Sequence, residues 1–163
     1  MSPLFRPRNP LLRRLLAGLA GLPVLFATAA SAGEREKLTG GEIGLLTGLA
    51  FGSEVSMGLE IALEPGWKTY WRAPGGRGIP PAVDTSGSIH VAAAVVDYPA
   101  PVRFGDGNGE SVGYVAPVVL PIRVRLADPS RPASLKASVS LGLCLEICAP
   151  ADAALAAAGK PGT

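Results

Sequence analysis

The sequence predicts an all-β protein, an antiparallel β-sandwich, and three observations support this prediction. Apolar and polar residues alternate with a period of two along most of the chain, which is the pattern of strands that bury one face. Turn signals rich in glycine and proline separate the alternating stretches at short intervals, as in sandwiches and barrels. No stretch shows a strong helical pattern, and the alanine-rich tail is the one place where a helix could be hidden.

The first clear strand is predicted over residues 54–64, where odd positions are apolar and even positions are small or acidic. Even-numbered carboxylates such as Glu60 and Glu64 are therefore expected on the solvent face, without a catalytic role. After a Pro-Gly turn signal, the sequence WKTYW, residues 67–71, continues as a short strand. The run APGGRGIPP, residues 73–81, is predicted as a loop because glycine and proline interrupt regular structure.

The second half of the chain continues the strand pattern. Residues 89–96 are predicted as a strand, and the run PAPVRFGDGNGESVG, residues 99–113, as a long exposed loop. Residues 114–126 alternate again and form the next predicted strand. Pro121 lies inside this strand and donates no backbone hydrogen bond, so we expect the strand at a sheet edge or with a bulge there.

The last predicted strands surround the two cysteines of the chain, Cys144 and Cys148. Residues 135–143 form a strand whose apolar residues are odd-numbered, and residues 151–158 a weak final strand. Because Cys144 is even-numbered, its side chain is expected on the opposite, less buried face, with an accessible sulfur. Four residues of extended strand span about 13 Å, whereas disulfides join Cα atoms roughly 4.4–6.8 Å apart. A disulfide therefore requires a bend after Cys144.

The first 32 residues have the pattern of an export signal. A basic region without acids is followed by an apolar run over residues 15–30, and Ala30-Ser31-Ala32 fits the small-x-small cleavage rule. The run is shorter than the ~20 residues of a membrane span, although a retained anchor is the alternative. We expect cleavage after Ala32 and an exported domain of residues 33–163. The basic region contains four arginines, Arg6, Arg8, Arg13 and Arg14.

The charge balance changes when this segment is set aside. The whole chain has 15 Lys and Arg against 13 Asp and Glu, and without the four arginines 11 basic residues face the same 13 acids. No basic excess remains to attract nucleic acid. No second hydrophobic span follows, so we expect a soluble domain. An exported chain meets an oxidising compartment, in which a disulfide persists.

Several other candidate sites are not supported by their surroundings. The single histidine, His90, has no orienting acid and no nucleophile at a recognisable spacing. The run GDGNGE, residues 105–110, lacks the lysine of a phosphate loop and the final acid of a calcium loop. Trp67, Tyr70 and Trp71 fit a core or rim position better than a ligand cage, although their closeness to the glycine- and proline-rich loop leaves a binding role open.

The residues alone leave three roles open for the cysteine pair. As a structural staple, a five-residue loop removes only about 2 kcal/mol of unfolded-state entropy. Small adjacent dithiols instead suit thiol–disulfide exchange. As a metal site, two thiolates fall short of the four ligands of zinc. Copper(I) accepts two sulfurs, and Met57 is a candidate further ligand, although no methionine is close to the cysteines in sequence. Glu146 lies between the cysteines and disfavours a thiolate, so exchange would depend on docking of a partner.

Four motifs of the chain occur in the same order in a known family: LEPGWKTYWRAPGGRGIPP, YPAPVRF, GYVAPVVLPIRV and LGLCLEICAPA. With them, residues 54–154 resemble the N-terminal periplasmic domain of the thiol:disulfide interchange protein DsbD. The resemblance implies an immunoglobulin-like sandwich in the periplasm, without a cofactor or metal. It also implies that a membrane-embedded or thioredoxin-like donor reduces the cysteine pair, which then reduces oxidised periplasmic proteins.

The same resemblance assigns roles to individual residues. Cys144 and Cys148 match the active cysteines, with Cys148 the sulfur that forms mixed disulfides, and Tyr70 matches an aromatic residue beside them. The loop that covers the sulfurs in the family matches residues 104–110, and we expect Phe104, Gly105, Asp106 and Gly107 to form this cover. The three-residue spacing of the cysteines is narrower than in the best-known members, and the donor domains are not part of this sequence.

The sequence therefore predicts an exported module that relays reducing equivalents through a Cys-x-x-x-Cys pair. Two alternatives remain: an immunoglobulin-like binding module whose disulfide is purely structural, and a copper(I)-handling protein. The redox midpoint of the pair discriminates the first alternative, because structural disulfides typically have potentials below about −300 mV.

Overall fold

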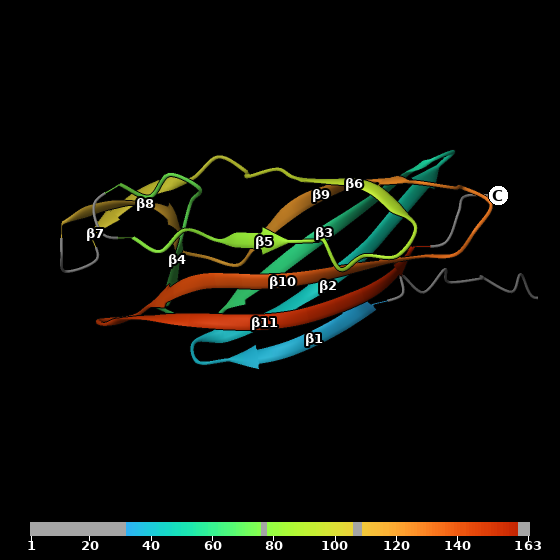
Figure 1. Cartoon of the computed structure of the whole chain (residues 1–163). Helices are drawn as coiled ribbons and strands as arrows, with labels where there is room; N and C mark the ends of the chain where they lie inside the picture. Colours follow the sequence, from blue (N-terminus) through green and yellow to red (C-terminus); the bar gives the residue numbers. More distant parts are fainter. Residues whose placement is uncertain (1–31, 76–77, 106–108, 160–163) are drawn as a thin grey trace, which may run out of the picture.

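The computed structural model of the chain describes residues 32–75, 78–105 and 109–159 (Figure 1). Within these residues it has eleven strands and no helix, and thus no helix long and apolar enough to cross a membrane. The predicted signal segment lies outside the described residues except for its last residue. The strands are β1 Ala32–Leu38, β2 Gly41–Phe51, β3 Glu54–Leu63, β4 Lys68–Tyr70, β5 Ala82–Asp84, β6 Val91–Val96, β7 Val102–Gly105, β8 Glu110–Tyr114, β9 Val118–Leu126, β10 Ala133–Cys144 and β11 Cys148–Gly159.

The strands form two antiparallel sheets that pack face to face, which confirms the predicted all-β, immunoglobulin-like sandwich (Figure 1). One sheet has the order β1-β2-β3-β9-β6, and the other has the order β11-β10-β4-β8-β7, with β5 paired to β10 beside this path. The long hairpin β10–β11 is in register from end to end, from Ala133 opposite Gly159 to Cys144 opposite Cys148. It carries both cysteines to one end of the sandwich.

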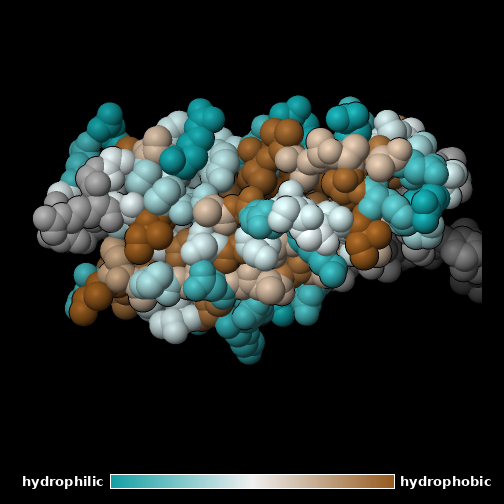
Figure 2. Space-filling view, in the orientation of Figure 1, coloured by the Kyte–Doolittle hydropathy of each residue, from teal (hydrophilic) through white to brown (hydrophobic). Residues whose placement is uncertain are grey.

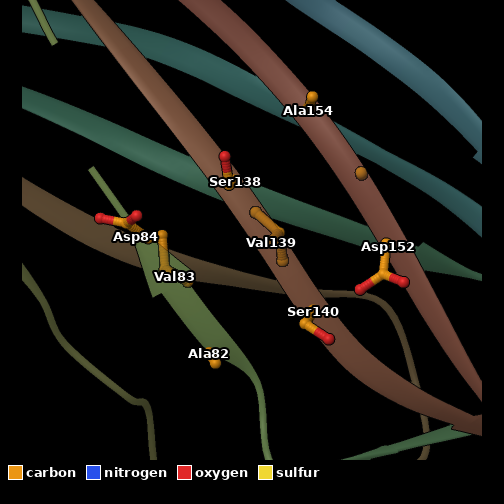
Figure 3. A pocket seen from close by; sticks show the side chains of 9 residues that line it. Ala82, Val83, Asp84, Ser138, Val139, Ser140, Asp152 and Ala154 are labelled. Carbon is orange, nitrogen blue, oxygen red and sulfur yellow. The ribbon is translucent and has the colours of Figure 1, made fainter. Parts of the chain in front are cut away.

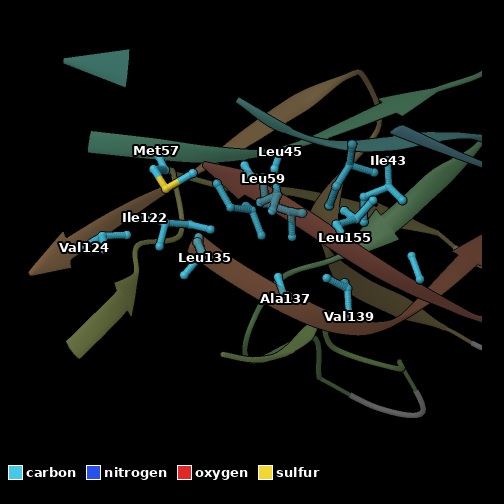
Figure 4. Close-up of a cluster of buried hydrophobic side chains, with 14 of the residues drawn as sticks. Ile43, Leu45, Met57, Leu59, Ile122, Val124, Leu135, Ala137, Val139 and Leu155 are labelled. Carbon is cyan, nitrogen blue, oxygen red and sulfur yellow. The ribbon is translucent and has the colours of Figure 1, made fainter. Parts of the chain in front are cut away.

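The core lies between the sheets and follows the predicted alternation (Figure 4). In β3, β9 and the first part of β10, alternate side chains are buried and the others face outward. Burial of such side chains stabilises the fold by roughly 1.5–3 kcal/mol each. The side chains labelled in Figure 4 are Ile43, Leu45, Met57, Leu59, Ile122, Val124, Leu135, Ala137, Val139 and Leu155.

Two expectations about strands were wrong. Residues 99–113 contain the hairpin β7–β8 and are not one long loop. The predicted final strand over residues 151–158 is confirmed, and β11 is longer than expected, with twelve residues that bury Leu155 and two alanines. Strand β9 is interior and pairs with β3 and β6. Pro121 is tolerated there because the β6 ladder ends at Val96, and the carbonyl of Pro121 accepts the Asp97 N–H beyond it.

Strands β1 and β2 were not anticipated. Strand β1 is rich in charge, and a bulge between Thr47 and Ala50 interrupts the alternation of β2. The turn between them needs Gly40, whose φ is 94° and whose missing Cβ leaves room for the Trp67 ring. Strand β1 runs alongside β11, so the first strand closes one side of the sandwich (Figure 1).

Candidate functional site

The two cysteines face each other across the tip of hairpin β10–β11. Strand β10 ends at Cys144 and β11 begins at Cys148, after a three-residue turn, which confirms the predicted bend. Their Cα atoms lie 4.1 Å apart and their sulfurs 2.17 Å apart, at disulfide distance. A short separation is typical of a non-hydrogen-bonded pair in an antiparallel ladder. The disulfide therefore joins two directly opposed strand residues.

Cys144 is buried, with an exposed fraction of 2%, so the expectation of an accessible sulfur was wrong. Its side chain is on the outer face of β10, but a second layer covers this face at the end of the strand. The Gly142 N–H donates to the Ile79 carbonyl over 3.1 Å. A Cβ added at Gly142 would lie 2.9 Å from Ile79 Cβ and 3.1 Å from Tyr70 Cδ2, so only glycine admits this cover. The even-numbered position of Cys144 predicted its face of the strand but not the residues that cover this face.

Tyr70 supplies a hydroxyl between the two sulfurs. It is 1% exposed and ends β4, which pairs with β10 at Cys144 and with β8. Its Oη lies 3.0 Å from Cys148 Sγ and 3.2 Å from Cys144 Sγ. Disulfide sulfurs carry no hydrogen, so the tyrosine O–H is the donor in these contacts. The structure thus brings Tyr70 to both cysteines.

Phe104 lies beside the Tyr70 ring. Its ring centroid is 6.0 Å from that of Tyr70, with the planes tilted by 35°, within the range of attractive aromatic pairs. Phe104 is half-buried, and Gly105 ends β7 in an exposed position. An ion pair between Arg103 and Glu110 joins the two strands of the hairpin. The other two residues selected for the cover, Asp106 and Gly107, lie outside the described residues.

Cys148 is the more accessible cysteine and lies beside an apolar tip. It is partly exposed, while Leu145 is 46% and Ile147 83% exposed in the turn before it. Hydrophobic atoms are visible at this tip in the space-filling view (Figure 2), at the end where β10 and β11 meet in Figure 1. A partner that approaches Cys148 would meet these side chains first.

Lys68 is a neighbour of the site that sequence reasoning missed. In β4 it is the register partner of Cys144, and directly opposed residues have Cβ atoms about 4.5–5.5 Å apart. A nearby cation favours a thiolate over a thiol, opposite to the effect expected of Glu146 in the turn. No lysine is close to the cysteines in sequence, so the signal lies only in the pairing of β4 with β10.

The other candidate residues have structural surroundings. His90 has a φ of 55°, and its Nδ1 lies 2.8 Å from the Pro132 carbonyl oxygen. Trp67 and Trp71 are half-buried against the core. Met57, considered for copper(I), is buried in the core. Among the described residues, no group of three or more His, Cys, Asp and Glu is placed to hold a metal ion.

A shallow hollow crosses β10 between β5 and β11, away from the sulfurs (Figure 3). Small side chains such as Ser138 and Ser140 form its floor, with Asp84 on one side and Asp152 on the other. The Ser86 backbone N–H and hydroxyl donate to Asp84 over 2.9 and 3.0 Å. These bonds hold the pKa of Asp84 below its usual value, with the backbone bond the larger cause. Asp84 thus already accepts hydrogen bonds from its neighbour Ser86, and the side chains of the hollow do not indicate a ligand or a reaction.

Fold and site together define an immunoglobulin-like sandwich domain that carries a cysteine pair at one end of its long hairpin. The family model for the N-terminal domain of the thiol:disulfide interchange protein DsbD matches residues 47–159, and the chain belongs to this family. No curated protein matched the sequence.

A solved structure agrees with the fold. The crystal structure of the N-terminal periplasmic domain of ScsB from Proteus mirabilis is similar, with a TM-score of 0.65 and 24% sequence identity. The match covers 78% of this chain and 51% of that chain, so the chain spans about half the length of that structure.

Proposed function

We propose that the domain exchanges its Cys144–Cys148 disulfide with partner proteins and relays reducing equivalents to oxidised periplasmic proteins. The observation that carries this proposal is the asymmetry of the pair. One sulfur is buried beneath an aromatic hydroxyl, and the other is partly exposed next to an apolar tip. An exchange centre needs this asymmetry because one sulfur must be attacked by a partner and the other must leave.

In the reducing step, a thiolate of the donor attacks Cys148 Sγ and forms a mixed disulfide. The bond between the two sulfurs breaks, and its electron pair leaves with Cys144 Sγ as a thiolate. A second donor thiol then resolves the mixed disulfide, so that the donor is oxidised and the pair is reduced by two electrons. In the next step the Cys148 thiolate attacks an acceptor disulfide, and Cys144 resolves that intermediate. The donor is a thioredoxin-like or membrane-embedded protein.

Tyr70 is proposed to stabilise the thiolate that leaves at Cys144. This sulfur is buried, so water cannot solvate its charge, and an unpaired buried charge is costly. The Tyr70 hydroxyl is 3.2 Å from it and already points its donor at the pair. A hydrogen bond to a charged group is worth about 1.5–3 kcal/mol. Lys68, opposed to Cys144 across the ladder, contributes in the same direction.

Phe104 is proposed to cover the pair when no partner is bound. Its ring lies on Tyr70 and is half-buried, and displacing it would open the approach to the sulfurs. The resemblance to the family implies that Gly105, Asp106 and Gly107 belong to the same covering loop. The cover would limit reaction with small disulfides and yield to a docked partner.

Export and location are part of the same proposal. Residues 1–32 would be removed as a signal peptide, and residues 33–163 would act in the periplasm. The signal pattern and the family both support this, as does the similarity to a periplasmic domain of ScsB. A fusion of residues 1–163 to a reporter that is active only after export tests it, with residues 33–163 as the control that should give no signal.

The redox midpoint of the purified domain against glutathione tests the exchange function. Structural disulfides typically have potentials below about −300 mV and resist glutathione. We expect a midpoint above that value, with reversible opening of the Cys144–Cys148 bond. A bond that glutathione leaves oxidised throughout would favour a purely structural disulfide.

A further inference from the structure

The edge of β11 that faces away from β10 differs along its length in how its backbone groups are hydrogen-bonded. Even-numbered residues of β11 direct their backbone groups away from β10, because the Gly142–Pro150 pair is non-hydrogen-bonded and the Gly142 N–H donates instead to Ile79. Further along this edge two outward donors are satisfied. The Ala154 N–H donates to Glu36 Oε2 over 3.2 Å, and the Ala156 N–H to Glu34 Oε2 over 3.1 Å.

Towards the cysteines, the same edge is open. The N–H groups of Cys148 and Asp152 and the carbonyls of Cys148, Pro150 and Asp152 point outward and make no hydrogen bond to another described residue. Strand β1, which supplies the two glutamates, ends before it reaches the hairpin tip (Figure 1). Cys148 is partly exposed, and Ala149, Pro150 and Asp152 are exposed. An unpaired strand edge is a template for pairing with another chain.

We propose that this open edge, from Cys148 to Asp152, binds an extended segment of the thiol-bearing partner by backbone strand addition. The inference rests on the proposed function, because a mixed disulfide at Cys148 fixes the partner's cysteine beside this edge. The chain next to that cysteine then runs along β11, where an extended backbone offers the alternating donors and acceptors that the edge requires. Glu34 and Glu36 favour pairing at the disulfide end, since they already accept the outward N–H groups of Ala154 and Ala156.

Pro150 limits the strength of this pairing. It lies in the middle of the open edge and has no N–H, so one carbonyl of the added segment stays unpaired. Proline is accepted at an edge strand where its nitrogen faces away from the ladder. A short and incomplete ladder suits a carrier, because the partner must leave after each transfer.

Asp152 and Ala154 provide a matched pair of substitutions. Asp152→Pro removes the outward N–H inside the proposed contact, and Asp152→Ala removes the carboxylate while it keeps that N–H. Ala154→Pro removes an outward N–H that Glu36 already occupies, outside the contact. The oxidised variants are each reduced by a reduced thioredoxin and by dithiothreitol, and second-order rate constants are measured. Dithiothreitol has no peptide backbone, so it reports the chemistry of the disulfide without docking.

We expect Asp152→Pro to react with thioredoxin about 2- to 12-fold more slowly than Asp152→Ala. This factor corresponds to the loss of one hydrogen bond worth about 0.5–1.5 kcal/mol. Both variants should react equally with dithiothreitol, and Ala154→Pro should match the wild type with both reductants. Equal thioredoxin rates for the two Asp152 variants would overturn the edge proposal alone. A wild-type disulfide that dithiothreitol reduces and thioredoxin does not would overturn the exchange function as well.

A second measurement does not depend on how Asp152→Pro folds. In a mixed disulfide of the Cys144→Ser variant with thioredoxin, the amide hydrogens of Cys148 and Asp152 should exchange more slowly than in the free variant. The Ala154 amide should not change, because its hydrogen bond is already present in the free protein. Unchanged exchange at Cys148 and Asp152 in the adduct would contradict strand addition.

Discussion

The two halves of hairpin β10–β11 show two ways in which one strand pair is used. In the half away from the cysteines, β10 buries Leu135 and Val139 against the other sheet and leaves Lys136 and Ser138 exposed. In the half near the cysteines, all four residues from Leu141 to Cys144 are buried, because a second layer covers the outer face. The first half stabilises the fold, and the second encloses the disulfide. Substitutions in the two halves should therefore separate stability from exchange.

The largest expected effect is on stability and comes from the core half. Leu135→Ala removes a side chain that is 1% exposed and should lower the free energy of unfolding by about 2–5 kcal/mol. Chemical denaturation measures this, and the rate of reduction by dithiothreitol should stay that of the wild type. A large change in that rate would show that the two halves are not independent. Lys136→Ala, on the exposed face, is the control for stability.

Removal of the disulfide should have a smaller effect on stability and a complete effect on exchange. The double variant Cys144→Ser, Cys148→Ser loses a short loop closure worth about 2 kcal/mol. It should remain folded in circular dichroism and thermal melting, while thiol–disulfide exchange disappears. If the variant no longer folds, the disulfide is required for the fold, as expected of a purely structural disulfide.

The Tyr70 hydroxyl should affect the rate and leave the fold intact. Tyr70→Phe keeps the ring beside Phe104 but removes the donor that lies 3.0 and 3.2 Å from the two sulfurs. Loss of a hydrogen bond to a leaving thiolate, about 1.5 kcal/mol at the lower limit, should slow reduction roughly tenfold. Tyr98→Phe is the matched control, since its hydroxyl donates to the Pro81 carbonyl over 3.1 Å. Equal rates for the two variants would exclude a role for the Tyr70 hydroxyl in leaving-group stabilisation.

The smallest expected effect concerns the aromatic cover. Phe104→Ala removes the ring that lies on Tyr70 and should speed the reaction of the reduced domain with a small disulfide reagent a few-fold. Val102→Ala, an exposed position of the same strand, should leave that rate unchanged. If the two variants react alike, hairpin β7–β8 is a connector and not a cover.

The sequence predicted the parts of the fold where one face is buried and the other is solvated. The alternation of β3 and β10 is of this kind, and both strands appear as expected. Prediction failed where that contrast is absent. Strand β1 is charged, and β2 contains a bulge that interrupts its alternation, so periodicity detected neither of them. Strand β11 has alanines on both faces, and only residues 151–158 of its twelve were predicted, as a weak strand.

The sequence predicted which residues form the candidate site but not that Cys144 is buried. The chain's two cysteines and the resemblance to a family identified Cys144, Cys148 and Tyr70, which the structure brings together. The burial of Cys144 could not be predicted, since it depends on segments that meet only after folding, with Ile79 beside Gly142 and Tyr70 beside the sulfurs. Lys68 was missed for the same reason, because its relation to Cys144 exists only through the pairing of β4 with β10.

The inequality of the two cysteines is the central claim, and trapping of a mixed disulfide tests it most directly. Cys144→Ser and Cys148→Ser are each incubated with a thioredoxin-like protein that lacks its own resolving cysteine and carries an activated disulfide on the attacking one. The products are separated on a non-reducing gel. Cys148 is partly exposed and Cys144 is 2% exposed, so Cys144→Ser should accumulate the covalent adduct and Cys148→Ser should not. An adduct that forms with Cys148→Ser alone would reverse the roles, and the absence of an adduct with either variant would contradict exchange.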